Sequence, residues 1–234
     1  MNKRTKSFLS FLLRALLAIV FIVAALLIIL SASGYRLQIA QRKVVQTAMV
    51  VVKALPRDTQ VILDGEVQNS SSSTLWRITN LEAGKHEVAV KKDGYITWGH
   101  QTVLEPGQTA LYQDVLLFLQ KPNIEIVSEN DQSGLIARLK QSKPETRIII
   151  KNNELYLDDI FVSRFLSTVT NPQLLADEAH ISYITNNKFH VIDIDGTNDV
   201  ELFGIPDNSP YILLNGSSQV LFQDGTTLKT ATIR

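Results

Sequence analysis

The sequence contains no cysteine, and this excludes a disulfide framework and a thiolate metal site. It has no excess of one charge either, because 23 Lys and Arg residues balance 23 Asp and Glu residues, so a strongly basic nucleic-acid-binding chain is excluded. Apolar residues make up 45% of the chain, which argues against disorder throughout. A length of 234 residues allows one or two domains.

Acidic residues are missing from the first part of the chain. Residues 1–47 carry seven Lys and Arg and no acid, a net charge of +7. Residues 48–120 carry six basic against eight acidic residues, and residues 121–234 carry ten against fifteen, so these blocks have net charges of −2 and −5. The basic end coincides with the one long apolar run of the chain.

That run comprises sixteen consecutive apolar residues at positions 15–30, and its neighbours extend it to 12–32. A helix needs about 20 residues to cross a hydrocarbon core of about 30 Å. Arg14 lies in the first turns, where its long side chain can reach the headgroups. We predict a transmembrane helix over 12–32. The alternatives are a cleaved signal peptide, which the small residues Ser31, Ala32 and Ser33 would suit, and a buried core helix.

The flanking charges predict the orientation of this helix. Four basic residues precede the span, and three follow it: Lys3, Arg4, Lys6 and Arg14 against Arg36, Arg42 and Lys43. The positive-inside rule therefore predicts a single-pass cell-membrane protein with a basic cytoplasmic N-terminus at 1–11 and residues 34–234 outside the cytoplasm. Residues 33–47 are expected to form a stalk, as a continuing helix or an interfacial segment, or a plain linker.

After residue 47 the apolar periodicity changes from helical to alternating, and turn residues become frequent. Six short strands are predicted, at 49–54, 61–63, 75–79, 86–90, 95–104 and 109–119. Residues 48–120 should therefore form a small antiparallel sheet or sandwich. Tyr95 and Trp98 are expected to pack in its core or rim, with a ligand platform as the less favoured role.

The motif residues of this block are Asp64-Gly65, Gly84-x-His86, Gly94-Tyr95 and Pro106-Gly107. Their order resembles the PEGA domain, a short β module of bacterial envelope proteins, over about residues 48–119. The resemblance implies that these eight residues are structural, with the glycines at turns. Residues 68–74 depart from the family pattern, which implies a longer or looser hairpin there.

Residues 121–234 contain three hairpin-like units, with turns at Asn153, Asn187 and Gly225 that lie 34 and 38 residues apart. This spacing is near that of propeller blades. Residues 191–203 are similar to blades of TolB-type periplasmic β-propellers, in which an aspartate-glycine turn follows a strand. A closed propeller needs about four blades. The region is therefore expected to be a shortened relative or a fragment of a longer protein, with an open edge after the last hairpin through which copies self-associate.

No arrangement of residues typical of catalysis or metal binding is found. The four histidines, His86, His100, His180 and His190, do not have zinc-site spacing. Asp193, Asp195 and Asp199 do not fit a calcium loop, since Asn198 and Gly204 stand where Gly and Glu are needed, so a turn between strands is predicted. The adjacent pairs at 158–159 and 177–178 are expected to be solvated acidic turns. We expect no cofactor and no metal.

The sequence thus predicts an all-β extracytoplasmic region after one transmembrane helix. The predicted function is binding or scaffolding without catalysis, with the lipid bilayer and an envelope protein or polysaccharide as partners, and without nucleic acid. The alternative is an envelope enzyme acting on glycans, with carboxylates brought together from the repeat region.

Overall fold

The computed structural model describes residues 3–32, 34–38, 43–68, 74–141 and 145–234. The chain divides into two compact units. The first unit comprises Met1–Val51, Arg77–His86 and Thr102–Leu111, and the second comprises Val52–Trp76, Glu87–Gln101 and Tyr112–Arg234. The domain limits expected from the sequence, at 47/48 and 120/121, stay a prediction.

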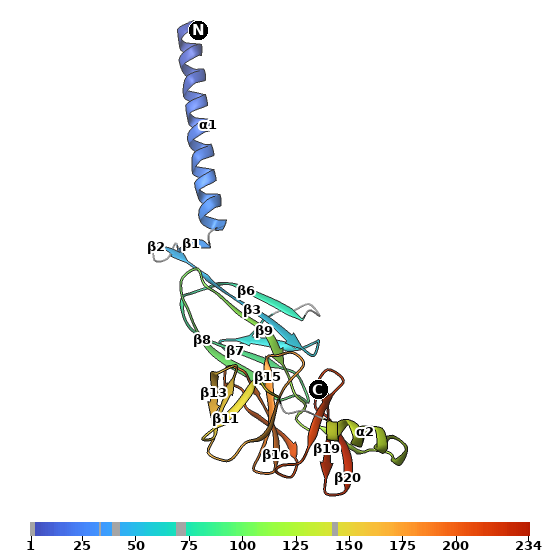
Figure 1. Ribbon diagram of the computed structural model, residues 1–234. Coiled ribbons are helices and arrows are strands. Elements are labelled where there is room, and N and C mark those ends of the chain that lie inside the picture. The colour runs from blue at the N-terminus through green and yellow to red at the C-terminus, as the bar shows by residue number, and fades with distance from the viewer. Residues whose placement is uncertain (1–2, 33, 39–42, 69–73, 142–144) are drawn as a thin grey trace. The chain divides into compact units, whose positions relative to one another are not determined.

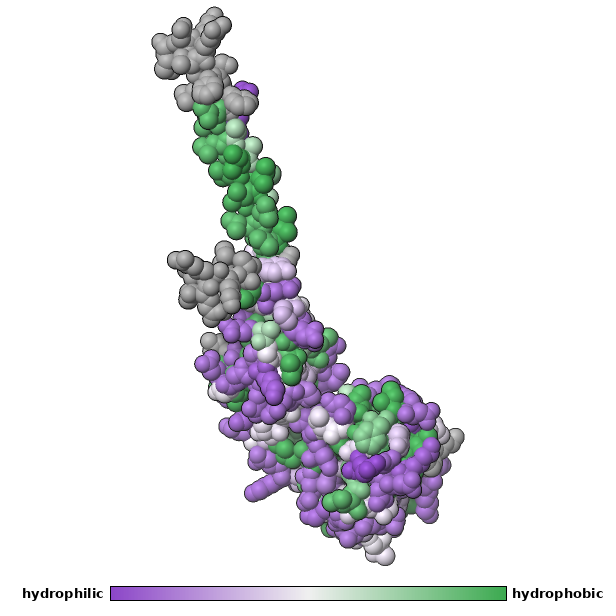
Figure 2. Space-filling view, turned by 90° about the vertical axis from the view of Figure 1, so that its left-hand side faces the viewer, coloured by the Kyte–Doolittle hydropathy of each residue, from purple (hydrophilic) through white to green (hydrophobic). Residues whose placement is uncertain are grey.

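The N-terminal part is a single helix, α1 (Lys3–Ala32) (Figure 1). Its segment Leu12–Ala32 is long and apolar enough to cross a membrane. Apolar side chains cover the visible face of this segment (Figure 2). Exposure of so much apolar surface is unfavourable in water, whereas it is favourable in the hydrocarbon core of a membrane. The structure thus contains the apolar N-terminal helix that the sequence predicted, and its length and composition allow it to span a membrane.

The stalk that follows is not a continuing helix. Strands β1 (Tyr35–Gln38) and β2 (Lys43–Gln46) pair antiparallel in a two-stranded sheet. Gly34 has a φ of 76°, and its carbonyl oxygen accepts a bond from the Thr47 backbone N–H (2.9 Å). A residue with positive φ ends a helix readily, and the β-branched pair Val44-Val45 favours a strand.

The middle block consists of short strands, as predicted. The strands are β3 (Ala48–Leu55), β4 (Gln60–Leu63), β5 (Glu66–Gln68), β6 (Leu75–Leu81), β7 (Gly84–Lys91), β8 (Trp98–Leu104) and β9 (Thr109–Leu116). They form two sheets, in the orders β6-β3-β9 and β5-β4-β7-β8. Buried side chains alternate along the strands, for example Val88 and Val90 on β7. The short strand β5 was not predicted, and the hairpin expected to be longer falls mostly on 69–73, outside the described residues.

The last block contains three more sheets and one helix (Figure 1). Its elements are β10 (Asn123–Ile126), α2 (Glu129–Gln141), β11 (Ile148–Lys151), β12 (Glu154–Leu157), β13 (Ile160–Arg164), β14 (Thr170–Leu174), β15 (His180–Thr185), β16 (Lys188–Asp193), β17 (Val200–Gly204), β18 (Tyr211–Leu214), β19 (Gln219–Asp224) and β20 (Thr227–Thr232). The sheet orders are β11-β12-β13, β14-β15-β16-β17 and β10-β20-β19-β18. We call them the first, second and third repeat sheets.

The three hairpins predicted from the repeats are confirmed. They are β11/β12, β15/β16 and β19/β20, each antiparallel. The turn residues Asn153, Asn187 and Gly225 have φ values of 61°, 57° and 59°, respectively. Asn152 and Asn186 also have positive φ, so the first two loops each contain two such residues, whereas Gly225 is the one positive-φ residue of the third loop. Both kinds of two-residue loop match the right-handed twist of the flanking strands.

The second repeat sheet lies between the other two, and both of its faces are buried. Ile181 and Tyr183 of β15 pack with Leu155 and Val162 of the first sheet. Alternate residues of the second sheet, such as Ile184 and Phe189, pack with the third sheet. All six residues of β15 are buried, because the strand is covered on both sides. In the described residues the stack closes into neither a barrel nor a propeller.

The open edge expected after the last hairpin is covered, so that expectation was wrong. β10, the first strand of the region, pairs with β20 along its whole length, from Asn123↔Thr232 to Ile126↔Lys229. Helix α2, which the sequence analysis did not predict, covers one face of the same sheet: Leu139 packs against Leu221 and Leu228. Self-association through the 121–234 edge stays untested, but its original reason is removed.

The core between the second and third repeat sheets also contains Leu116 and Phe118, from the end of the middle block. Backbone bonds continue this contact, since the Leu119 N–H donates to the Ile233 carbonyl oxygen (2.8 Å). The middle block is therefore not closed on itself. Its last residues complete the core of the repeats.

Gly196 provides a test of the stacked arrangement. Its φ is 82°, and a Cβ atom there would run into the backbone carbonyl of Val162 in the first repeat sheet. Gly225 has a φ of 59°, but a Cβ atom there would meet nothing within 4 Å. We expect Gly225→Ala to lower the free energy of unfolding by about 1 kcal/mol, the cost of the left-handed backbone alone. Gly196→Ala should cost clearly more, about 2–4 kcal/mol, since a clash is added to this strain. Urea unfolding of both variants measures the difference, and equal losses would contradict the close packing of the two sheets.

Candidate functional site

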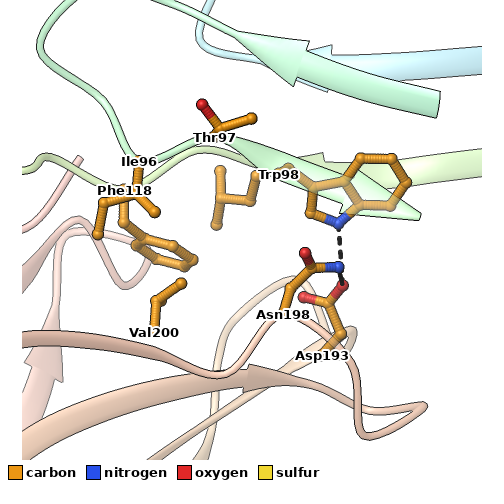
Figure 3. Close-up of a pocket in the computed structure, with 8 residues that line it drawn as sticks. Ile96, Thr97, Trp98, Phe118, Asp193, Asn198 and Val200 are labelled. Carbon is orange, nitrogen blue, oxygen red and sulfur yellow. Dashed lines mark hydrogen bonds between the residues drawn. The ribbon is translucent and has the colours of Figure 1, made fainter. Parts of the chain in front are cut away.

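The main polar cluster of the second unit centres on the carboxylate of Asp193, at the end of β16. Its Oδ2 accepts hydrogen bonds from Trp98 Nε1 (2.9 Å) and from Asn198 Nδ2 (3.0 Å), as Figure 3 shows. The Asn198 side-chain oxygen in turn accepts a bond from the Gly99 backbone N–H (3.1 Å). Trp98 and Gly99 belong to β8 of the middle block, whereas Asp193 and Asn198 belong to the repeats. The cluster therefore joins two regions that are far apart in the sequence.

The other oxygen of Asp193 faces a buried histidine. His180 Nε2 lies 3.2 Å from Asp193 Oδ1, and His180 Nδ1 lies 2.9 Å from Asp177 Oδ2. His180 and Asp193 are directly paired residues of β15 and β16, which places both side chains on the same face of the sheet. The His180 side chain is only 2% exposed. Its two ring nitrogens thus bond to two carboxylates away from water.

This arrangement changes two pKa values. Burial alone would lower the pKa of His180, but hydrogen bonds to Asp177 and Asp193 outweigh burial and raise it to about 9. Burial likewise opposes ionisation of Asp177, yet the hydrogen bond to His180, the charge of His180 and the bond from the Ala179 backbone together outweigh burial and lower the pKa of that carboxyl. The histidine is consequently a cation at neutral pH, and both of its N–H groups donate.

A small cleft lies beside the cluster, between Ile96, Leu116, Phe118 and Val200 (Figure 3). Its free space is about 10 Å³, which is barely what a single water molecule requires. The polar groups around it are bonded to one another rather than directed into an open cavity. The site is therefore built as a joint between strands and has no room for a substrate.

Aromatic rings extend the joint on the side of the middle block. The Trp98 ring stacks on His100 (centroids 6.0 Å apart), and its edge meets Tyr112 (5.4 Å). Trp98 is buried, whereas His100 and Tyr112 are half-buried. The packing role expected for Trp98 matches this position. Its indole N–H also has a polar partner, as a buried tryptophan requires.

The residues named from the family motif lie at turns and strand ends outside the Asp193 cluster. Asp64 and Gly65, with φ values of 51° and 84°, connect β4 to β5, and an Asp64 side-chain oxygen accepts the Glu87 backbone N–H (2.9 Å). Gly84 begins β7, and His86 Nε2 donates to the Glu82 carbonyl oxygen (2.8 Å).

The other motif residues have similar positions. Gly94 has a φ of 80°, and Tyr95 forms an isolated bridge with Leu119. Pro106 and Gly107 occupy the turn between β8 and β9, where Gly107 has a φ of 77°. These φ values fit turns, and the family role of the eight residues stays a prediction.

Among the carboxylates considered for catalysis, one from each acidic pair bonds to the same basic residue, Arg147. Arg147 bonds to Asp158 (Nη2 to Oδ2, 2.7 Å) and to Glu178 (Nη1 to Oε2, 3.3 Å), and the hydrogen bond from Arg147 lowers the pKa of Asp158. Asp158 lies in an exposed turn, as expected. Asp177 is also exposed, as expected, but its carboxylate bonds to the buried His180 and its side chain is 25% exposed. Among the described residues, no group of three or more His, Asp and Glu is placed to hold a metal ion.

The sequence analysis identified Asp193 only as part of a turn, and it missed His180 and Asn198 as its partners. A local signal existed, since Asp177 precedes His180 by three residues. The bond from Trp98 spans 95 residues, and no sequence spacing indicates it.

Comparison with known families gives one match. Residues 47–116 match the PEGA domain, which confirms that resemblance for about a third of the chain. No curated protein matches the chain.

The cluster predicts how stability depends on pH. Because the pKa of His180 rises from 6.5 to about 9 on folding, its contribution is complete below pH 6.5 and disappears as the pH rises through 9. The lowered pKa of Asp177 adds a contribution that is lost as the pH falls below about 3.8. Stability should be greatest between about pH 4 and 6.5, and it should fall by about 1–3 kcal/mol from pH 6 to 9.

Urea titration followed by tryptophan fluorescence at both pH values measures this fall. His180→Gln should remove most of it, whereas the matched control His190→Gln should retain it, since His190 lies outside the cluster. A fall that is unchanged in His180→Gln would contradict the assignment.

Proposed function

We propose that the chain is a single-pass bacterial cell-envelope protein that displays its β region outside the cytoplasm for binding or scaffolding, without catalysis. A PEGA domain together with an N-terminal apolar helix fits such a role. The basic flank of residues 1–11 supports a cytoplasmic N-terminus. The net charge of −5 on residues 121–234 gives no reason to expect nucleic acid as a partner.

The observation that carries the proposal is the Asp193 joint. It fixes the β8 end of the middle block to the repeats through charged and aromatic contacts, and Leu116 and Phe118 add apolar contacts. A rigid body that presents loops and strand edges is suited to binding. We further propose that the three stacked sheets are a shortened relative of TolB-type propellers, in which β10 completes the last sheet.

The alternative is a glycan-cleaving enzyme. A glycosidase needs one carboxyl group whose raised pKa keeps it protonated as a general acid. The four described carboxyl groups with a shifted pKa, Glu154, Asp158, Asp177 and Glu201, are all shifted downward by hydrogen bonds to neighbouring side chains. They remain ionised, and this favours binding over acid catalysis.

Spheroplasts that carry the full chain test the proposal. We expect intact spheroplasts to bind purified peptidoglycan or solubilised envelope proteins saturably, without release of new reducing ends over hours. Glu154→Gln and Asp158→Asn should leave this binding unchanged, as should the matched control Asp93→Asn outside the repeats.

Two results would contradict the proposal. Release of reducing ends that disappears in Glu154→Gln or Asp158→Asn, but not in Asp93→Asn, would establish the enzyme. Binding that appears only after the spheroplasts are lysed would show that the β region is cytoplasmic.

A further inference from the structure

The outer edge of the third repeat sheet differs from the other sheet edges of the repeats. Of the six edge strands, β13, β14 and β17 have register shifts in their pairing, a feature that blunts an edge. Of the three regular edge strands, β11 and β18 each contain buried or half-buried residues, whereas all four residues of β10 are exposed. β10 is therefore the regular edge strand whose residues are the most exposed in the described repeats.

The direction of its backbone groups follows from the pairing with β20. The Val127 N–H donates to the Leu228 carbonyl oxygen (3.0 Å), in the same register as the pair Glu125↔Thr230. Residues alternate in direction along an antiparallel strand, so the backbone groups of Ile124 and Ile126 point away from β20. Among the described residues, no other segment bonds to this outer row. The two isoleucine side chains are 43% and 70% exposed.

An open groove runs along this strand. It is lined by Glu125 and Ile126 of β10, by Leu135 and Arg138 of α2, and by Thr230 of β20. The groove thus offers an apolar wall and charges of both signs next to an unpaired row of backbone donors and acceptors. Such a combination suits an extended chain, which supplies backbone bonds and alternating side chains.

We propose that β10 accepts an extended polypeptide strand of a partner protein whose sequence reads apolar, basic, apolar. This inference rests on the proposed binding function and names the partner class. A strand beside β10 forms hydrogen-bonded pairs at Ile124 and Ile126 and a non-hydrogen-bonded pair at Glu125, where side chains approach most closely. A Lys or Arg opposite Glu125 is therefore favoured, and β-branched residues suit the two flanking positions.

A second copy of this chain is a poorer occupant. Antiparallel pairing of two β10 strands centred on residue 125 would place Glu125 opposite Glu125, and like charges directly opposite destabilise a sheet. The charge at the centre of the strand thus distinguishes a basic partner from self-pairing.

The test uses the full chain in lipid nanodiscs and a capped nine-residue peptide of valine and threonine with one central lysine. We expect saturable binding that slows hydrogen exchange at the amides of Ile124 and Ile126. Ile126→Pro removes one outward N–H without changing the groups that face β20, and proline is tolerated at such edge positions. It should weaken binding about tenfold or more, whereas the matched control Ile126→Val should stay within about twofold.

A second variant, which reverses the charge of Glu125, tests the proposal even if Ile126→Pro fails to fold. Glu125→Lys should lose the lysine peptide and bind a peptide with a central glutamate. Three results would each overturn the proposal. They are absence of peptide binding, binding without slowed hydrogen exchange at Ile124 and Ile126, and a Glu125→Lys variant that still prefers the lysine peptide. Dimers that form through β10 without peptide would overturn it in favour of a second copy. If the peptide fails while spheroplasts still bind an envelope component, only this inference falls and the proposed function stands.

Discussion

The arrangement of the second unit depends on the hydrogen bonds and the ion pair that the Asp193 carboxylate makes. Burying a carboxylate is costly unless charged and polar donors surround it. Here the donors come from both regions, namely Trp98 in the middle block and His180 and Asn198 in the repeats. If either region moved away, the partly buried charges would lose these bonds. The same bonds occupy the polar groups, so the joint is a structural centre. The function is accordingly expected at the strand edges and loops that the joint holds in place.

The repeats also have to bury apolar surface, because three small separate sheets would expose six faces to water. Stacking buries both faces of the second sheet. Leu116 and Phe118 add to the core between the second and third sheets, and α2 packs on the other face of the third sheet. β10 protects the backbone of β20 but leaves its own outer row unpaired. The sequence suggested that β20 would be the free edge of the region. In the structure β20 is paired, and the free edge is β10. Because β10 is the free edge, its unpaired backbone groups form the surface at which we propose that a partner strand binds.

Local features were predictable from the sequence, and long-range ones were not. The hairpin turns at Asn153, Asn187 and Gly225 follow from residues that tolerate positive φ, and the PEGA match follows from motif residues close together in the chain. The apolar run of α1 is defined by composition alone. In contrast, β10 pairs with a strand about a hundred residues away, and the Trp98 bond spans 95 residues. Helix α2 carries only a short apolar pattern, Leu135, Ile136 and Leu139, whose role depends on the sheet it covers.

A double-mutant cycle between Trp98 and Asp193 tests the central claim, that the middle block and the repeats are joined into one binding body. Trp98→Phe removes the indole N–H, Asp193→Asn removes the charge, and urea unfolding of the full chain gives the free energies for the four proteins. Residues in direct contact show coupling of about 0.5–3 kcal/mol, whereas independent sites add within about 0.3–0.5 kcal/mol. The structure predicts a coupling of about 1 kcal/mol or more for this pair. Additive losses would show that β8 and the repeats are not joined at this bond, and this result would contradict the account.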